Sequence, residues 1–157
     1  MRVGITGHRG LSTEVEERVR TLLADAVSGY NGAELVGVSC IADGPDAWFA
    51  EAVLSAGGRL EVVVPATEYR DSLPEWHHST YDALMARASD VHTTGMTASD
   101  SEAHMTGSEI LVGLADELVA VWDGKPAWGY GGTADVVAYA ERNGVPVRVL
   151  WPEGASR

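Results

Sequence analysis

The sequence has few of the features that mark secreted and membrane proteins. It contains one cysteine, Cys40, so no internal disulfide can form, and the cytoplasm is the expected location. No apolar run approaches the roughly 20 residues that a membrane-spanning helix needs. Residues 1–7 lack the layout of a signal peptide and have the pattern of a strand.

Basic residues are also scarce. The chain has 11 Lys and Arg against 23 Asp and Glu, which gives a net charge of −12. General binding to nucleic acid phosphates requires a basic face, so we expect no nucleic-acid partner. A small anionic ligand remains compatible with this charge, because backbone N–H groups and one or two arginines can hold a phosphate locally. Without a cysteine cluster or an H-E-x-x-H motif, no metal site is expected.

The composition is that of an ordinary globular domain. Of the 157 residues, 45% are hydrophobic and 22% are charged. No linker, repeat or low-complexity stretch interrupts the chain, so residues 1–157 are expected to form a single domain.

Strand and helix patterns alternate along the whole chain. Short apolar or β-branched runs predict strands at 2–7, 34–39, 60–64, 91–94, 117–122 and 145–151. Helical spacing predicts helices at 11–28, 47–56, 101–114 and 131–143, with a further helical stretch inside 67–90. Such alternation predicts a three-layer α/β fold with a mostly parallel sheet of about six strands.

Three polar turns follow predicted strands, at residues 7–10, 39–46 and 123–133. In open parallel sheets, ligands bind beyond the carboxyl ends of the strands, near the point where strand order reverses. We therefore expect these turns to meet and to form one ligand site.

The first turn carries Gly7, His8 and Arg9. The planar guanidinium of Arg9 can hold two phosphate oxygens, although a solvated surface arginine explains the residue equally well. His8 titrates near neutrality and is a candidate general acid or base, but such a histidine more often only forms hydrogen bonds in a turn.

The second turn offers Ser39, the N–H groups around Ala42 and Gly44, and the carboxylates of Asp43 and Asp46. A carboxylate at this place can accept ribose hydroxyls. Turn formation and helix capping explain both aspartates as well, and the two interpretations are compatible. The cysteine in this turn is interpreted as a small buried residue rather than as a nucleophile, because no histidine lies near it in sequence.

The third turn is the strongest indication of a ligand site. Gly131, Gly132, Thr133 and Ala134 lie between a buried strand and a helix, where free N–H groups and the helix dipole attract an anion. Glycine allows a ligand to approach the backbone closely. The segment lacks the Gly-Lys-Ser/Thr of a P-loop.

The ends of the third turn add polar and aromatic candidates. Trp122 and Asp123 end the strand and are counted among the ligand-binding residues. Core packing explains Trp122 better than base stacking does, whereas Tyr130 is the better stacking candidate.

Three sets of residues together resemble the SLOG superfamily. They are residues 4–9 (GITGHR), residues 42–46 (ADGPD) opening a helix, and residues 118–124 (LVAVWDG) followed by 131–135 (GGTAD). The superfamily includes the LOG-type nucleoside-monophosphate phosphoribohydrolases, also called lysine decarboxylase-like proteins, and the DNA-processing protein DprA. The resemblance covers nearly the whole chain. It implies a Rossmann-like fold, a nucleotide-related ligand and a homodimer.

The chain departs from the LOG motif P-G-G-x-G-T-x-x-E at its last position. The resemblance assigns hydrolysis of the N-glycosidic bond to that glutamate together with an arginine, but the position three after Thr133 is Val136. Valine cannot perform acid or base chemistry. Asp135 is the only nearby carboxylate, and it leaves the helix about 100° away from Val136.

These patterns leave three hypotheses open. The first is binding or sensing of a nucleotide or nucleotide-derived ligand without a further cofactor, with the phosphate on the N–H groups of residues 131–133. The second is a hydrolase that cleaves an N-glycosidic or phosphate bond, with Asp135, Glu109 and His8 as candidate catalytic residues. The third is a structural or partner-binding domain that needs no ligand.

Overall fold

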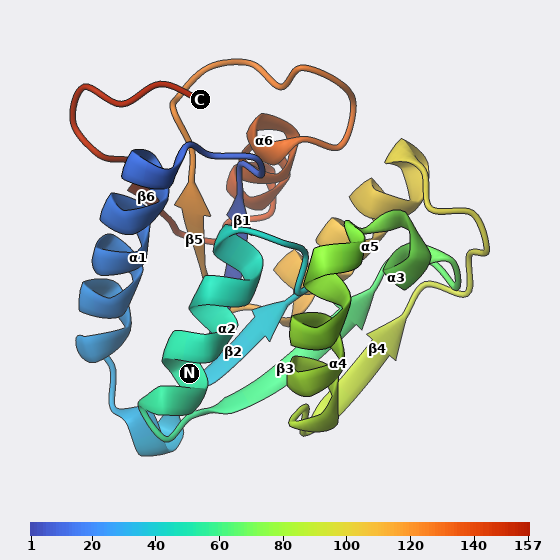
Figure 1. Cartoon of the computed structure of the whole chain (residues 1–157), viewed down its shortest axis with the longest axis horizontal. Helices are drawn as coiled ribbons and strands as arrows, with labels where there is room; N and C mark the ends of the chain where they lie inside the picture. The colour runs from blue at the N-terminus through green and yellow to red at the C-terminus, as the bar shows by residue number, and fades with distance from the viewer.

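The computed structural model describes all 157 residues and contains one six-stranded sheet (Figure 1). The strands are β1 (Arg2–Gly7), β2 (Val36–Ser39), β3 (Arg59–Val64), β4 (Asp90–Thr93), β5 (Glu117–Val121) and β6 (Val147–Leu150). Every neighbouring pair is parallel, in the order β4-β3-β2-β1-β5-β6. The expected α/β fold is therefore confirmed, and the sheet is parallel throughout.

Helices cover both faces of this sheet. They are α1 (Thr13–Ser28), α2 (Pro45–Ser55), α3 (Tyr69–Ser72), α4 (His78–Ala86), α5 (Ser101–Leu114) and α6 (Thr133–Arg142), with 3-10 turns at Gly32–Glu34 and Glu75–His77. Helices α1 and α2 pack on one face, with α4 beside α2, and α5 and α6 pack on the other (Figure 1). None of these helices combines the length and the apolar character that crossing a membrane requires.

Local sequence signals account for three of the six helix starts, those of α1, α2 and α5. The hydroxyl of Ser12 accepts a hydrogen bond from the N–H of Val15, and the carboxylate of Asp100 accepts one from Ala103 at 2.9 Å. Helix α2 begins differently, at Gly44 with φ of +98° followed by Pro45 at the first helical position. Strand β2 is shorter than predicted, because the residues before it form a 3-10 turn.

The order of the strands places the ligand-binding edge. From β1 the chain moves outward through β2, β3 and β4, and it then returns to add β5 and β6 on the other side of β1. The switch in strand order therefore lies between β1 and β5, and their carboxyl ends flank the crevice where such sheets bind ligands.

A glycine at the end of β1 lets α2 begin close to this crevice. A Cβ on Gly7 would lie 2.8 Å from Cβ of Pro45 and 2.9 Å from Cβ of Val121. Any larger residue would push the start of α2 away from the sheet. The closeness of the first two turns thus depends on this glycine.

Candidate functional site

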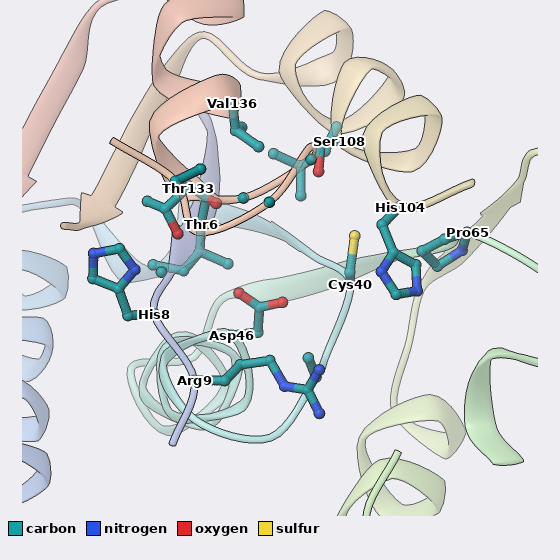
Figure 2. A pocket seen from close by; sticks show the side chains of 18 of the residues that line it. Thr6, His8, Arg9, Cys40, Asp46, Pro65, His104, Ser108, Thr133 and Val136 are labelled. Carbon is teal, nitrogen blue, oxygen red and sulfur yellow. The ribbon is translucent and has the colours of Figure 1, made fainter. Parts of the chain in front are cut away.

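A cavity of about 350 Å³ opens at the switch point. The turns after β1, β2 and β5 all line it, together with the end of β3, α3, α5, the start of α6 and the C-terminal Arg157. Figure 2 shows lining residues from several of these segments, among them His8, Cys40 and Thr133. The expectation that the three polar turns meet at one edge of the sheet is confirmed.

Part of the predicted residue set lines the cavity. The predicted residues that line the cavity are Gly7, His8, Arg9, Ala42, Asp46, Gly131, Gly132 and Thr133. The remaining predicted ligand-binding residues are not part of this lining: Ser39, Asp43, Gly44, Trp122, Asp123 and Ala134, which directly follows the lining residue Thr133. For Ser39, Asp43 and Asp123, the hydrogen bonds described below indicate that they position the lining.

The start of α6 presents unpaired backbone donors. The N–H groups of Thr133 and Ala134 donate to no acceptor in the protein, and no side chain caps this helix. Gly132 donates to the carbonyl of Gly129 at 3.3 Å. Of the donors predicted at 131–133, only that of Thr133 is therefore free, and the next free donor is that of Ala134.

Asp135 explains why the donor of Gly131 is not free. Its Oδ2 accepts a hydrogen bond from the N–H of Gly131 at 2.9 Å, which closes the glycine turn onto the first turn of α6. Gly131 has φ of +87° and lies close to the carbonyl of Ser101. Asp135 is thus a turn-stabilising residue outside the cavity lining, and it does not lie where a substitute for the missing glutamate would be needed.

Glu109 also lies outside the cavity. On α5 the residues that face it are His104, Ser108 and Leu111, which follow one another at helical spacing. Glu109 leaves the helix about 100° away from Ser108 and therefore points elsewhere. The sequence predicted this helix, but it did not predict which side of α5 meets the edge of the sheet.

His8 is buried and engaged at both ring nitrogens. Nδ1 lies 3.2 Å from the guanidinium of Arg157, and Nε2 lies 3.2 Å from Oδ1 of Asp123. An arginine can only donate, so Nδ1 accepts, whereas Nε2 meets both the carboxylate Oδ1 and the backbone N–H of Asp123, each at 3.2 Å. Burial, with the charge of Arg157, lowers the pKa of His8 although the Asp123 contact opposes this. The ring is a neutral structural link without a free nitrogen for a substrate.

Arg157 is the main residue that the sequence analysis missed. Besides His8, its guanidinium binds Oδ2 of Asp123 at 2.9 Å and the carbonyl of Pro126 at 2.7 Å, and it lies 4.3 Å from the ring centre of Trp128. These contacts join the C-terminal segment to the turns after β1 and β5. They also bring a second cation to the cavity, for which the sequence offers no local signal.

Arg9 supplies the first cation. Its Nε and Nη2 donate to Oδ1 of Asp43 at 2.9 and 2.6 Å, and its side chain remains half-exposed. Asp43 is therefore the partner that orients Arg9, rather than a free acceptor for a ribose.

The turn after β2 is held in an unusual conformation. Ile41 has φ of +47°, which is rare for a β-branched residue. The hydroxyl of Ser39 accepts from the N–H of Ile41 and donates to the backbone carbonyl of Asp46, both at 2.9 Å. His77 donates to the carbonyl of Ile41 at 2.9 Å. Together these bonds fix the start of α2 against β2.

Asp46 is the acidic side chain of the cavity. Its carboxylate points toward the side formed by Thr6 and Thr133, with Arg9 on its other side (Figure 2). Burial raises the pKa of Asp46 to about 7, and the N–H of Ala42 and the charge of Arg9 oppose this only in part. The residue is only partly shielded from solvent, because its carboxylate faces the open cavity.

A group of weakly polar side chains completes the wall beside Asp46. Burial raises the pKa of Cys40 and of Tyr69 well above their usual values, so both remain neutral. Burial and the charge of Arg9 lower the pKa of His104, whose Nε2 lies 2.8 Å from the hydroxyl of Ser99. Tyr69 and His104 also pack edge to face at 5.7 Å.

Two aromatic side chains stand at the rim of the cavity. Trp128 is 83% exposed and Tyr130 is 65% exposed, and both belong to its lining. Trp122 is not part of the lining, and its indole N–H donates to the carbonyl of Lys125 at 2.8 Å. The predicted role of Trp122 in core packing is not seen, because this half-buried side chain belongs to neither hydrophobic cluster.

Metal-ligating side chains gather at one place away from the cavity. Glu61, Asp90 and His92 bring their ligand atoms within 4.8 Å of one another on β3 and β4. Arg2 also donates to Glu61 at 3.0 Å and already balances this buried carboxylate. The group is accounted for as an ion-pair network between β1, β3 and the edge strand β4.

The fold matches solved structures, although no protein-family model and no curated protein matches the sequence. DprA from Helicobacter pylori superposes over 99% of this chain and 68% of its own, with a TM-score of 0.70 and 17% identity. The chain therefore shares the fold of this DprA. DprA from Streptococcus pneumoniae has the same TM-score at 18% identity, and the present chain spans about half of it, 52%.

The fold is also similar to that of a cofactor-binding protein. The molybdenum cofactor binding protein from Rippkaea orientalis matches over 94% of this chain and 74% of its own, with a TM-score of 0.60 and 17% identity. Proteins with this fold thus bind different ligands.

One expectation from composition is wrong. The Helicobacter pylori DprA binds single-stranded DNA, so proteins of this fold do have nucleic-acid partners. Net charge is a sum over the whole surface, whereas binding depends on the local field of one groove. In this chain Arg9 and Arg157 bring positive charge to the cavity in spite of a net charge of −12.

Proposed function

We propose that this protein binds or senses a phosphate-containing small ligand, a nucleotide or a nucleotide derivative, in the cavity between β1 and β5. The phosphate would accept hydrogen bonds from the N–H groups of Thr133 and Ala134. The observation that carries this proposal is that these two donors are unpaired at the start of a ten-residue helix beside a cavity.

The charges around the cavity support an anionic ligand. Arg157 has three guanidinium contacts in place, so it is held rigidly, and Arg9 is oriented by Asp43. Preorganised cations of this kind lose little conformational freedom when an anion binds. Asp46 is the only Asp or Glu in the cavity lining.

The rim supports a planar group on the ligand. Trp128 and Tyr130 are exposed beside the phosphate-binding end of the cavity, and either ring can stack on a base. Asp46, on the opposite wall, is the remaining polar group that can meet a ribose hydroxyl. The hydrolase alternative is less well supported, because Asp135 and Glu109 lie outside the cavity and both nitrogens of His8 are occupied.

Two substitutions at one position test the phosphate contact. Thr133→Pro removes both the N–H and the hydroxyl, whereas the control Thr133→Val removes only the hydroxyl. Proline suits this first helical position, and Gly132 before it is already extended with ψ of 177°, so the backbone tolerates the change. A charge-assisted hydrogen bond contributes about 1.5–3 kcal/mol, so the proline variant should bind roughly 10- to 100-fold more weakly than the valine variant.

The measurement is a thermal-shift and calorimetric panel of AMP, ADP-ribose, ribose 5-phosphate and a single-stranded oligonucleotide. A ligand at 100 times its dissociation constant stabilises the protein by about 2.7 kcal/mol, which the shift detects. Equal binding by both variants would refute the phosphate placement. Absence of any shift with the wild type would favour a ligand-free, partner-binding domain, and a response to the oligonucleotide alone would redirect the proposal to nucleic acid.

A further inference from the structure

Asp46 is placed unusually for a residue of an anion site. It contributes the only Asp or Glu side chain that lines the cavity, and it faces the wall that holds the start of α6 (Figure 2). Its backbone is fixed in the first turn of α2 by the hydroxyl of Ser39, and its carboxyl group accepts from the N–H of Ala42.

No cation is paired with this carboxyl group. The nearest guanidinium, that of Arg9, gives its Nε and Nη2 to Asp43. Arg157 is committed to Asp123 on the other side of the cavity. Asp46 thus receives part of the field of Arg9 but no hydrogen bond from it.

The other groups around Asp46 do not favour its ionised form either. Cys40, which follows β2, and Tyr69 on α3 are both neutral. The charge of Asp46 helps to raise the pKa of each. His104 on α5 is kept neutral by burial and by Arg9, and Asp43 adds a second negative charge. An unpaired carboxylate in such surroundings holds its proton to an unusually high pH.

An anion at the start of α6 brings another negative charge into the same cavity. We propose that the cavity takes up its anionic ligand together with one proton, and that Asp46 carries this proton and donates it in a hydrogen bond to the ligand. This inference rests on the proposed function, because it requires an anion at Thr133 and Ala134.

The dependence on pH follows from linkage. Free Asp46 titrates at about 7, and repulsion from a bound anion raises its pKa further. Well below about pH 7, Asp46 of the free protein already carries its proton, so ligand binding takes up almost none. Above about pH 7, Asp46 of the free protein is ionised, so each binding event takes up a proton from solution. The affinity then falls up to tenfold for each pH unit.

The test is calorimetric proton counting. ADP-ribose and AMP are titrated into the full chain at about pH 6 and about pH 8, each in two buffers of different ionisation enthalpy. ADP-ribose is the sharper probe, because its two phosphates have no second ionisation near pH 6 as a phosphomonoester has. The variants are Asp46→Asn and, as a control, Glu109→Gln, which removes a carboxyl group near the cavity but outside it.

We expect the wild type and the control to take up close to one proton per ADP-ribose at the higher pH and almost none at the lower pH. Asp46→Asn should take up none at either pH and should bind roughly tenfold more tightly than the wild type at the higher pH. Melting temperatures of both variants verify that they fold.

Two results would overturn the inference while leaving the proposed function intact. One is binding to the wild type without proton uptake at the higher pH. The other is loss of binding in Asp46→Asn, which would mean that the ionised carboxylate accepts a hydrogen bond from the ligand. Absence of binding by either probe at both pH values would instead refute the proposed function, and this inference with it.

Discussion

Replacing Asp46 by asparagine should stabilise the protein, and more so as pH rises. Asparagine has nearly the same shape and keeps an oxygen that can accept the N–H of Ala42. What it removes is a carboxyl group that burial holds at a pKa of about 7 instead of 3.8. The unfolded chain releases this proton at much lower pH than the folded chain does.

The magnitude follows from the size of this shift. A group whose pKa is raised on folding destabilises the folded state progressively as pH rises from the unfolded to the folded value. The shift from 3.8 to about 7 is roughly three units at 1.36 kcal/mol each, which gives about 4 kcal/mol above both values. Between about pH 5 and about pH 8, the advantage of Asp46→Asn over the wild type should grow by about 3 kcal/mol.

Urea unfolding of both proteins at the two pH values measures this difference directly. For a domain of this length it corresponds to roughly 6–12 °C in melting temperature. Asp43→Asn is the matched comparison, because it removes a carboxylate three residues away that is ion-paired with Arg9, and it should destabilise the protein. A stability difference for Asp46→Asn that does not change with pH would refute the reasoning, since the carboxylate would then have a compensating partner.

Two further substitutions examine the rest of the cavity. Arg157→Met removes a cation that lowers the pKa of His8, so an NMR titration should find this pKa higher than in the wild type, while Arg148→Met on the exposed strand β6 should leave it unchanged. Asp135→Ala should lower the free energy of unfolding by about 1 kcal/mol, because a turn donor before α6 loses its acceptor; a neutral effect would show that this hydrogen bond does not hold the glycine turn.

Much of the fold could be predicted because its signals are local. Alternating apolar runs and helical spacing predicted every strand, with β1 and α5 predicted to the residue. Asp-Gly, Gly-Pro and glycine-rich segments marked the three turns. The parallel order then required these turns to lie at one edge, so the position of the cavity also followed from sequence.

The roles of individual side chains could not be predicted in the same way. Asp135 and Glu109 were reasonable catalytic candidates by their place in sequence, yet one bonds to Gly131 and the other leaves α5 on a side that does not line the cavity. Asp43 and Asp46 were equivalent ribose candidates. The structure separates them, since only Asp43 has an arginine partner.

The sequence by itself determined the elements, the parallel sheet and the three turns at its carboxyl edge, because backbone propensity and turn chemistry depend on neighbouring residues. Tertiary structure alone decided which N–H groups stay free, which carboxyl group faces the cavity and which cations reach it. Arg157 meets His8 across 149 positions of the chain. Burial, charge and hydrogen bonding at such a site depend on contacts between residues that are distant in sequence, and no local pattern records them.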